Sequence, residues 1–212
     1  MDLKHFPLRR FIVMFLGIVL LGCGIGLFKL SLTGNDPSSA MVMAVADTVG
    51  MEFAPMLLIF NCAWFLVEIL WGRKLIGIGT FVNWFFTGTF ASLFLKLIAP
   101  VTDRWDIAGS LPLKLGILCV GILVLSFACS LYQTADLGIA PYDSHSILLS
   151  RLTKIPYFWC RMLTDSACVA VALLFGGLIG IGTLVCALGL GPFIAFFSKN
   201  LARRLCGFRE DA

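Results

Sequence analysis

Charge is scarce in this chain. Asp, Glu, Lys and Arg together make up 13% of its 212 residues, whereas hydrophobic residues make up 59%. A soluble domain carries about 25% charged residues, so this chain cannot cover itself with a surface that faces water. The scarcity excludes a soluble globular domain. The formal net charge of +4 gives no reason to expect nucleic acid as a partner, because the basic residues act as topology signals.

Residues that could hold a metal or carry out catalysis are also scarce. The chain has two histidines, His5 and His145, and none of its eight cysteines forms a C-x-x-C motif. We therefore expect no metal site, no disulfide and no cofactor. Asp143, Ser144 and His145 are adjacent and too local to form a catalytic triad, so we do not expect an enzyme. His145 could titrate in a proton pathway, although an ordinary loop histidine is the simpler interpretation.

Long apolar runs are what the chain has instead. A helix of about 17–25 residues crosses the hydrocarbon core of a bilayer, and the mean hydropathy of the chain is +0.98. The sequence contains six apolar runs of suitable length and therefore predicts an all-α polytopic membrane protein with six transmembrane helices. The runs are Phe11–Phe28, Ala54–Trp71, Leu75–Ile98, Leu115–Leu131, Ile155–Phe175 and Leu178–Phe197.

The basic residues predict how these helices are oriented. If the N-terminus is cytoplasmic, the inside segments hold twelve Lys and Arg residues and the outside segments hold four. This excess follows the positive-inside rule. We expect a multi-pass protein of the bacterial plasma (inner) membrane with both termini in the cytoplasm. Arg9 and Arg10 precede the first run as in a signal peptide, but no small-residue cleavage site follows, so we interpret the run as an uncleaved span.

An internal duplication divides the chain. The sequence L-I-G-I-G-T occurs at Leu75–Thr80 and again at Leu178–Thr183, 103 positions later, and Gly34 recurs as Gly138 at an offset of 104. Each copy holds three predicted spans, and because three is odd, the second copy must enter the membrane from the opposite side. We expect two inverted three-helix repeats, as in many secondary transporters. The predicted boundaries are 1–98 for the first repeat, 99–113 for an external linker, 114–198 for the second repeat and 199–212 for a short cytoplasmic tail that frays.

A break follows the first span of each copy. A glycine is followed three residues later by a proline, Gly34 and Pro37 in the first copy and Gly138 and Pro141 in the second. Proline is favoured at the first helical position and Asp36 is a competent N-cap. A helix of about 11–13 residues, too short to span, should therefore begin at each proline. Two interpretations stay open: the short helices are re-entrant and aim their N-termini at a common midplane site, or they are amphipathic connectors at the membrane surface.

The second copy carries a family pattern. L-G-I-A-P-Y-D at Leu137–Asp143 is followed by a short helix, a span, G-I-G-T at Gly180–Thr183 and G-P-F at Gly191–Phe193. This pattern resembles the YczE/YyaS/YitT-like family of bacterial integral membrane proteins, and the resemblance covers nearly the whole chain. The first copy departs from it, because Gly34–Pro37 has no aromatic–acid pair after the proline. The YitT branch carries a cytosolic C-terminal domain that this chain lacks, so the resemblance favours the YczE-like branch. It implies a membrane protein of transport-like shape without an agreed substrate.

Ionisable residues within predicted spans are functional candidates, because each is costly when it faces lipid. Asp165 lies near the middle of the fifth run, and Arg161 lies one helical turn before it, in position for an i,i+4 pair. We expect Asp165 to line a central polar cavity with Asn61, which lies at a similar depth in the first copy. Alternatively, Arg161 snorkels to the cytoplasmic headgroups. We expect Glu68 to form a near-interface ion pair with Arg73-Lys74.

Two groups of candidate site residues follow. Thr80 and Thr183 could gate a pathway or simply bond back to the carbonyl four residues earlier. The candidate substrate-binding residues are Asn35, Asp36, Asn61, Gly138, Tyr142, Asp143 and Asp165. The candidate structural or gating residues are Gly34, Pro37, Thr80, Asn83, Pro141, Arg161 and Thr183.

These features predict a small transporter or permease that moves a small polar or amphiphilic solute by alternating access of two inverted repeats. The alternative is a non-transporting membrane partner, a substrate-capturing or accessory subunit of another complex. The expected partners are the lipid bilayer and a small-molecule solute. A homodimer is plausible because six spans is small for a carrier. The charge of the solute stays open: helix N-termini favour an anion, whereas the acidic residues favour a cation or protons.

Overall fold

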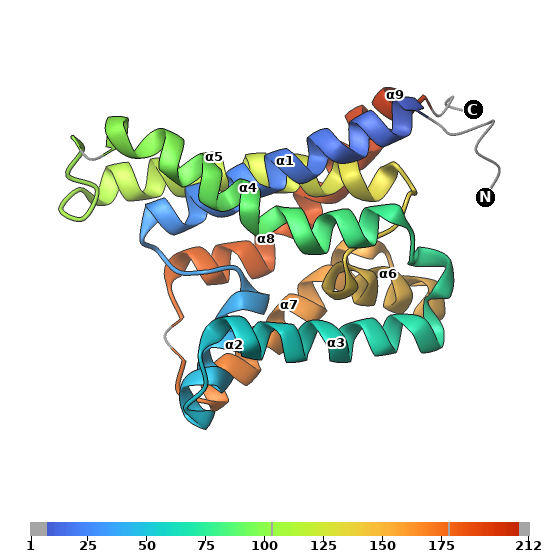
Figure 1. Ribbon diagram of the computed structural model, residues 1–212, viewed down its shortest axis with the longest axis horizontal. Coiled ribbons are helices and arrows are strands. Elements are labelled where there is room, and N and C mark those ends of the chain that lie inside the picture. The colour runs from blue at the N-terminus through green and yellow to red at the C-terminus, as the bar shows by residue number, and fades with distance from the viewer. Residues whose placement is uncertain (1–7, 103, 178, 208–212) are drawn as a thin grey trace.

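The computed structural model describes residues 8–102, 104–177 and 179–207, and within these residues all regular structure is helical. Figure 1 shows two groups of helices, one above the other, and many of the helices run roughly along the long axis of the molecule. The elements are α1 (Leu8–Ser31), α2 (Pro37–Val49), α3 (Phe53–Trp71), η2 (Arg73–Leu75), α4 (Ile78–Thr102), α5 (Leu111–Thr134), α6 (Pro141–Thr153), α7 (Tyr157–Leu174), α8 (Ile181–Phe197), η3 (Ser198–Ala202) and α9 (Arg203–Cys206).

Five of the described helices are long and apolar enough to cross a membrane: α1, α4, α5, α7 and α8, the last continued through α9. The predicted second span corresponds to α3, whose apolar part Pro55–Trp71 is shorter than these five. The all-helical, multi-pass membrane class therefore follows from length and hydropathy together. Six spans were expected, and the described residues contain five helices long enough to span and one shorter apolar helix.

The upper group in Figure 1 is built around α1, which packs along α5 and α4. Small residues let the backbones approach closely: a Cβ atom on Gly17 would lie 2.8 Å from the backbone nitrogen of Tyr132, and one on Gly24 would lie 3.0 Å from the Cα atom of Leu125. Close approach through glycine is a common way to pack helices in membranes, where burial from water supplies no driving force between them. The side chains of Met14 and Ile18 are fully buried in this interface.

The second group holds the two short helices. α2 packs on α7 and α3, α6 packs on α3 and α7, and α7 packs on α8. Each short helix has 13 residues and begins with a proline, and the side chain of Asp36 accepts a hydrogen bond from the Ser39 amide at 3.0 Å. The predicted short helices, their starts at Pro37 and Pro141, and the Asp36 cap are thus confirmed.

The ends of the predicted linker and tail differ from the expectation. α4 continues through Pro100 to Thr102 and α5 begins at Leu111, so both helices extend into the predicted 99–113 linker. Residues 198–206 form helical turns, Cys206 is buried, and the Arg9 guanidinium donates to the carbonyl oxygens of Leu205 and Arg204, both at 2.8 Å. These contacts tie the C-terminal turn to the start of α1. The remainder of the predicted tail, 208–212, lies outside the described residues.

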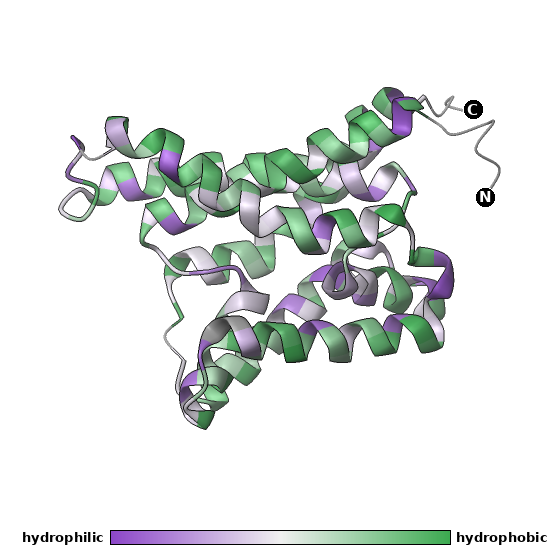
Figure 2. Ribbon diagram, in the orientation of Figure 1, coloured by the Kyte–Doolittle hydropathy of each residue, from purple (hydrophilic) through white to green (hydrophobic). Residues whose placement is uncertain are grey.

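Large apolar side chains cover much of the outer surface. Phe85 and Leu97 on α4 and Leu174 on α7 are 69%, 71% and 84% exposed. Figure 2 shows these outer helix surfaces to be mainly hydrophobic, while hydrophilic residues gather at the helix ends and in the interior near α6 and α7. Lipid is the medium in which such a surface is stable. The bilayer is therefore the expected partner of α3, α4 and the outer sides of α7 and α8.

Candidate functional site: two backbone junctions and a buried ion cluster

The break after α1 contacts the start of α8. The amide of Gly182 donates to the carbonyl oxygen of Thr33 at 2.9 Å, and the Thr183 hydroxyl donates to the carbonyl oxygen of Asn35 at 2.6 Å. Gly34 has φ +129°, and a Cβ atom there would lie 2.5 Å from the Thr183 Oγ1 atom. Only glycine fits this position without strain. Thr183 therefore holds the first break in place.

The break after α5 contacts the start of α4 in the same way. The amide of Gly79 donates to the carbonyl oxygen of Leu137 at 2.8 Å, and the amide of Ile139 donates to the carbonyl oxygen of Leu75 at 2.9 Å. Gly138 has φ +117°, and a Cβ atom there would lie 2.7 Å from the backbone of Gly77. Each copy of the L-I-G-I-G-T motif thus contacts the break of the other copy. Position 178, where the second motif begins, lies outside the described residues.

The two threonines differ from the alternative that each bonds to the carbonyl four residues earlier. Thr183 bonds across to Asn35, 148 positions away in the sequence. The Thr80 hydroxyl donates to the Leu75 carbonyl at 3.4 Å, five positions earlier, and accepts from the Gly77 amide at 3.2 Å. Both therefore stabilise the non-helical start of their spans.

Backbone conformations recur at the offset of the duplication. Among the described residues, three non-glycine residues have positive φ, and two of them follow α1 and α5 at equivalent positions: Leu32 at +53° and Asp136 at +56°. The third, Lys154 at +61°, ends α6 where Gly50, at +72°, ends α2. Residues other than glycine rarely adopt a positive φ. The recurrence therefore indicates that equivalent segments of the two copies fold alike.

A buried ion cluster lies where α6 begins and α7 passes it. Arg161 is 6% exposed, and its Nε atom donates to the Asp165 carboxylate at 3.1 Å while its guanidinium also donates to the Asp143 carboxylate. The predicted Arg161–Asp165 pair is confirmed, and the alternative that Arg161 snorkels to the headgroups is wrong. Arg161 is therefore not a loop charge, and removing it from the twelve inside residues leaves eleven against four.

Tyrosines complete the cluster. The Tyr132 hydroxyl donates to Asp143, the Tyr142 hydroxyl donates to Asp165, and the Cys168 thiol lies 3.6 Å from the Tyr142 oxygen. The Arg161 guanidinium lies 5.0 Å from the centre of the Tyr142 ring, within range of a cation–π contact. Sequence reasoning did not include Tyr132. A usable signal existed, because the chain has three tyrosines and all fall between positions 132 and 157.

Glu68 corrects a further expectation. Its carboxyl group is fully buried and has no hydrogen-bond partner among the described residues, so it is not paired with Arg73 or Lys74. Arg73 instead donates to the carbonyl oxygen of Ile69 at 2.8 Å. The polar neighbours of Glu68 are Asp143 and Ser144 on α6. The first half of the chain thus contributes an acidic side chain to the same region as the ion cluster.

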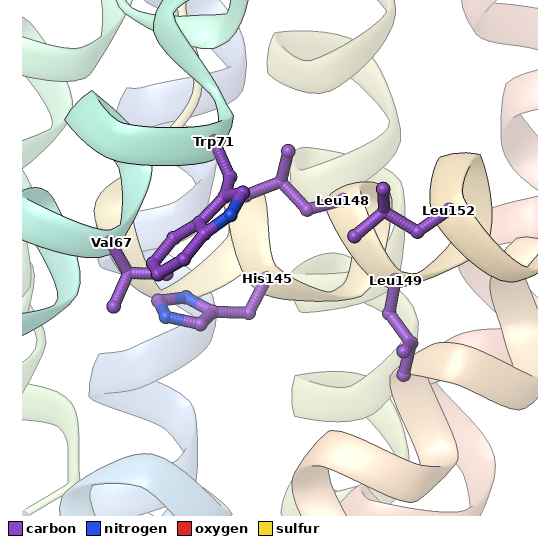
Figure 3. A pocket seen from close by; sticks show the side chains of 6 residues that line it. All are labelled: Val67, Trp71, His145, Leu148, Leu149 and Leu152. Carbon is purple, nitrogen blue, oxygen red and sulfur yellow. The ribbon is translucent and has the colours of Figure 1, made fainter.

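Two small apolar pockets flank α6, and both include His145. One, of about 250 Å³, lies between α3 and α6, and Figure 3 shows the side chains that line it, among them Trp71 and His145. The other, of about 210 Å³, is lined by Met41, Trp64, Tyr142, His145, Thr164, Ala167, Cys168 and Val171. His145 lies on α6, with its Nδ1 atom 2.8 Å from the Pro141 carbonyl oxygen, and so is not a loop histidine.

The remaining candidate residues are spread around this centre. Asn61 is half-buried on α3 and has no hydrogen bond to Asp165, and Asp165 itself is fully enclosed behind Tyr142. The Asn35 side-chain amide lies 3.0 Å from the Met43 sulfur atom. Asn83 is buried on α4, where its Nδ2 atom has no partner among the described residues. The structure therefore brings together Tyr142, Asp143, Arg161 and Asp165, and leaves Asn61 and Asn83 outside their hydrogen-bond network.

Comparison with known proteins places most of the chain in one family. Residues 8–199 match the family of unknown function DUF6198. An uncharacterized protein of Haemophilus influenzae is 25% identical over 193 residues, covering 90% of this chain and 84% of that protein. Two proteins of Bacillus subtilis also match: the uncharacterized protein YyaS, 25% identical and covering 87% of this chain and 94% of YyaS, and the uncharacterized membrane protein YczE, 24% identical and covering 92% and 87%. No solved structure matches. The chain therefore belongs to the DUF6198 family, with YczE- and YyaS-like relatives.

Proposed function

We propose that this protein is a small secondary transporter in which two inverted repeats alternate in exposing a central site. The observation that carries the proposal is the ion cluster of Asp143, Arg161 and Asp165, buried beside the broken segment that begins α6. Ionisable groups in the interior of a membrane protein usually mark a pathway for a substrate or ion. Discontinuous helices beside such groups are typical of transporter binding sites.

The reciprocal junctions support the inverted-repeat part of the proposal. The bond from Gly182 to Thr33 has its equivalent in the bond from Gly79 to Leu137, at offsets of 103 and 104. In Figure 1, α1 and α4 run towards the loop between α4 and α5, whereas α5 and α8 run away from it. Equivalent helices of the two halves thus point in opposite directions. Movement of one half against the other would act at these two junctions.

The charges of the cluster favour a cationic solute. Arg161 faces two carboxylates, so the enclosed side chains carry more negative than positive charge when all three are ionised. The adjacent pocket is lined by Trp64 and Tyr142, whose ring centres lie 5.1 Å apart. Aromatic faces attract organic cations. We therefore propose a small amine or quaternary ammonium compound with an apolar portion as the solute class.

Uptake by the purified chain in proteoliposomes tests this proposal. The assay compares small primary and quaternary ammonium compounds with carboxylates of similar size. We expect saturable uptake of at least one cation, reduced tenfold or more by Asp165→Asn and unchanged by Asp47→Asn, because Asp47 is exposed on α2. Correctly folded protein that takes up no compound would contradict transport and favour an accessory-subunit function.

A further inference from the structure

Glu68 is the buried acidic residue that the ion cluster does not use. It lies on α3, is 0% exposed, and neither carboxyl oxygen has a hydrogen-bond partner among the described residues. An ionised carboxylate without a partner in a low-dielectric interior is strongly unfavourable, and such a group takes up a proton instead. Its isolation therefore requires either a bound cation or a proton.

The polar side chains near Glu68, Asp143 and Ser144, have no free hydrogen-bond donor to offer its carboxyl group. The Asp143 carboxylate already accepts from Tyr132 and Arg161. The Ser144 hydroxyl already donates its hydrogen to the Pro141 carbonyl oxygen, at 2.7 Å. A carboxylate at position 68 would thus face acceptors only, whereas a protonated carboxyl would supply the missing donor. The surroundings of Glu68 match the protonated form.

The other titratable groups on elements packed against α3 do not neutralise Glu68. On α6, His145 lines the neighbouring pocket, Arg151 is exposed, and Asp143 is paired with Arg161 of α7. On η2, Arg73 and Lys74 are exposed. On and before α2, Asp47 is exposed and Asp36 caps the helix. Asp143 is therefore the charged side chain that faces Glu68, and its sign disfavours ionisation.

We propose that Glu68 carries an exchangeable proton that couples movement of α3 against α6 to the proton gradient. In the arrangement described, the Glu68 carboxyl is neutral. When α3 and α6 separate and water reaches the group, the O–H bond breaks, water accepts the proton and the carboxylate is hydrated. A metal cation fits less well, because the oxygens of Asp143 are already engaged and Glu68 alone offers too few ligands. The coupling part rests on the proposed transport function; the proton exchange does not.

Infrared difference spectroscopy of the purified protein in lipid tests the exchange directly. The carboxylic-acid carbonyl stretch should be present near neutral pH, should shift when H₂O is replaced by D₂O, and should be lost in Glu68→Gln. Glu52→Gln is the matched control, since Glu52 lies at the start of the same helix and is exposed. A band that survives Glu68→Gln, or that does not shift in D₂O, would overturn the proposal, and the second observation needs no variant.

Transport measurements separate this proposal from the function it extends. With an acidic outside solution, the rate of cation uptake by the wild type should differ from the rate measured without a pH gradient. Glu68→Gln should reduce that difference tenfold or more. A response unchanged in Glu68→Gln would overturn the coupling and leave transport standing. An exchangeable Glu68 band in a protein that takes up no solute would support the exchange and contradict the transporter function.

Discussion

At the scale of single residues, Arg161 is the centre of the candidate site. It is the basic side chain that the ion cluster contains, and it contacts carboxylates from two different helices, α6 and α7. Its partners are held in turn by Tyr132 and Tyr142. Because buried charges are tolerated only when they are paired and hydrogen-bonded, the removal of Arg161 affects both carboxylates at once.

The variant Arg161→Leu should therefore be destabilised strongly, by about 3–5 kcal/mol, because it leaves buried charges uncompensated. Thermal unfolding in detergent, followed by loss of the monodisperse peak in size exclusion, measures this. Arg104→Leu is the control, since Arg104 is exposed in the loop between α4 and α5. Equal midpoints for the two variants would show that the ion cluster does not stabilise the fold.

A double variant tests whether Arg161 has one partner or two. If Arg161 served Asp165 alone, replacing both by Leu would restore the stability lost in Arg161→Leu. Because the Asp143 carboxylate also accepts from Arg161, we expect only partial rescue, with a residual loss of about 1–3 kcal/mol from the group left unsatisfied. The same unfolding assay measures this. Full rescue would show that Asp143 is not a stabilising partner of Arg161.

At the scale of elements, the two broken segments are held by backbone atoms of the other half of the chain. Gly34 has φ +129° and Gly138 has φ +117°, and each contacts a glycine in the L-I-G-I-G-T motif of the other copy. At each junction the contact leaves no room for a side chain on either of the two segments that meet. The breaks are thus structural joints between the halves, positioned beside the ion cluster.

The variant Gly138→Ala should be destabilised for two reasons. The positive φ is unfavourable for alanine by about 1–3 kcal/mol, and the added methyl group would overlap the backbone of Gly77, with an overpacking penalty of similar size. Gly88→Ala is the control, because a Cβ atom there meets nothing within 4 Å and alanine favours the helix. Thermal unfolding compares them. If Gly138→Ala is as stable as Gly88→Ala, the junction does not hold the break.

At the scale of the whole molecule, the chain has two polar ends separated by apolar helix surfaces. The start of α1 contacts α9 at one end, and the loop between α4 and α5 lies at the opposite end (Figure 1). The turn between α3 and α4, with Arg73 and Lys74, lies at the same end as α9. The excess of basic residues at this end predicts that it faces the cytoplasm.

Cysteine labelling on a cysteine-free background checks the orientation. A membrane-impermeant maleimide should modify Ala108→Cys in intact cells and should modify Lys74→Cys only after permeabilisation, since both positions are exposed but lie at opposite ends. Labelling in the reverse order would place the basic end outside. Labelling of both positions in intact cells would contradict a spanning arrangement of α4.

The sequence alone determined the class of the protein and the starts of its two short helices. Scarce charge and long apolar runs are sufficient for a membrane assignment, because the bilayer acts on composition and length. Pro37, Pro141 and Asp36 marked the short helices correctly because caps are local. The Arg161–Asp165 pair was also accessible, since residues one turn apart on a helix are neighbours.

The tertiary structure decided which distant residues meet. No sequence periodicity places Tyr132 of α5 against Asp143 of α6, or the Gly182 amide against Thr33. Glu68 was misjudged because its distance from Arg73 along the chain is short, whereas the packing of α3 on α6 turns the side chain inward. Local propensities fix where a helix begins and ends, but burial and the pairing of charges are properties of the packed molecule.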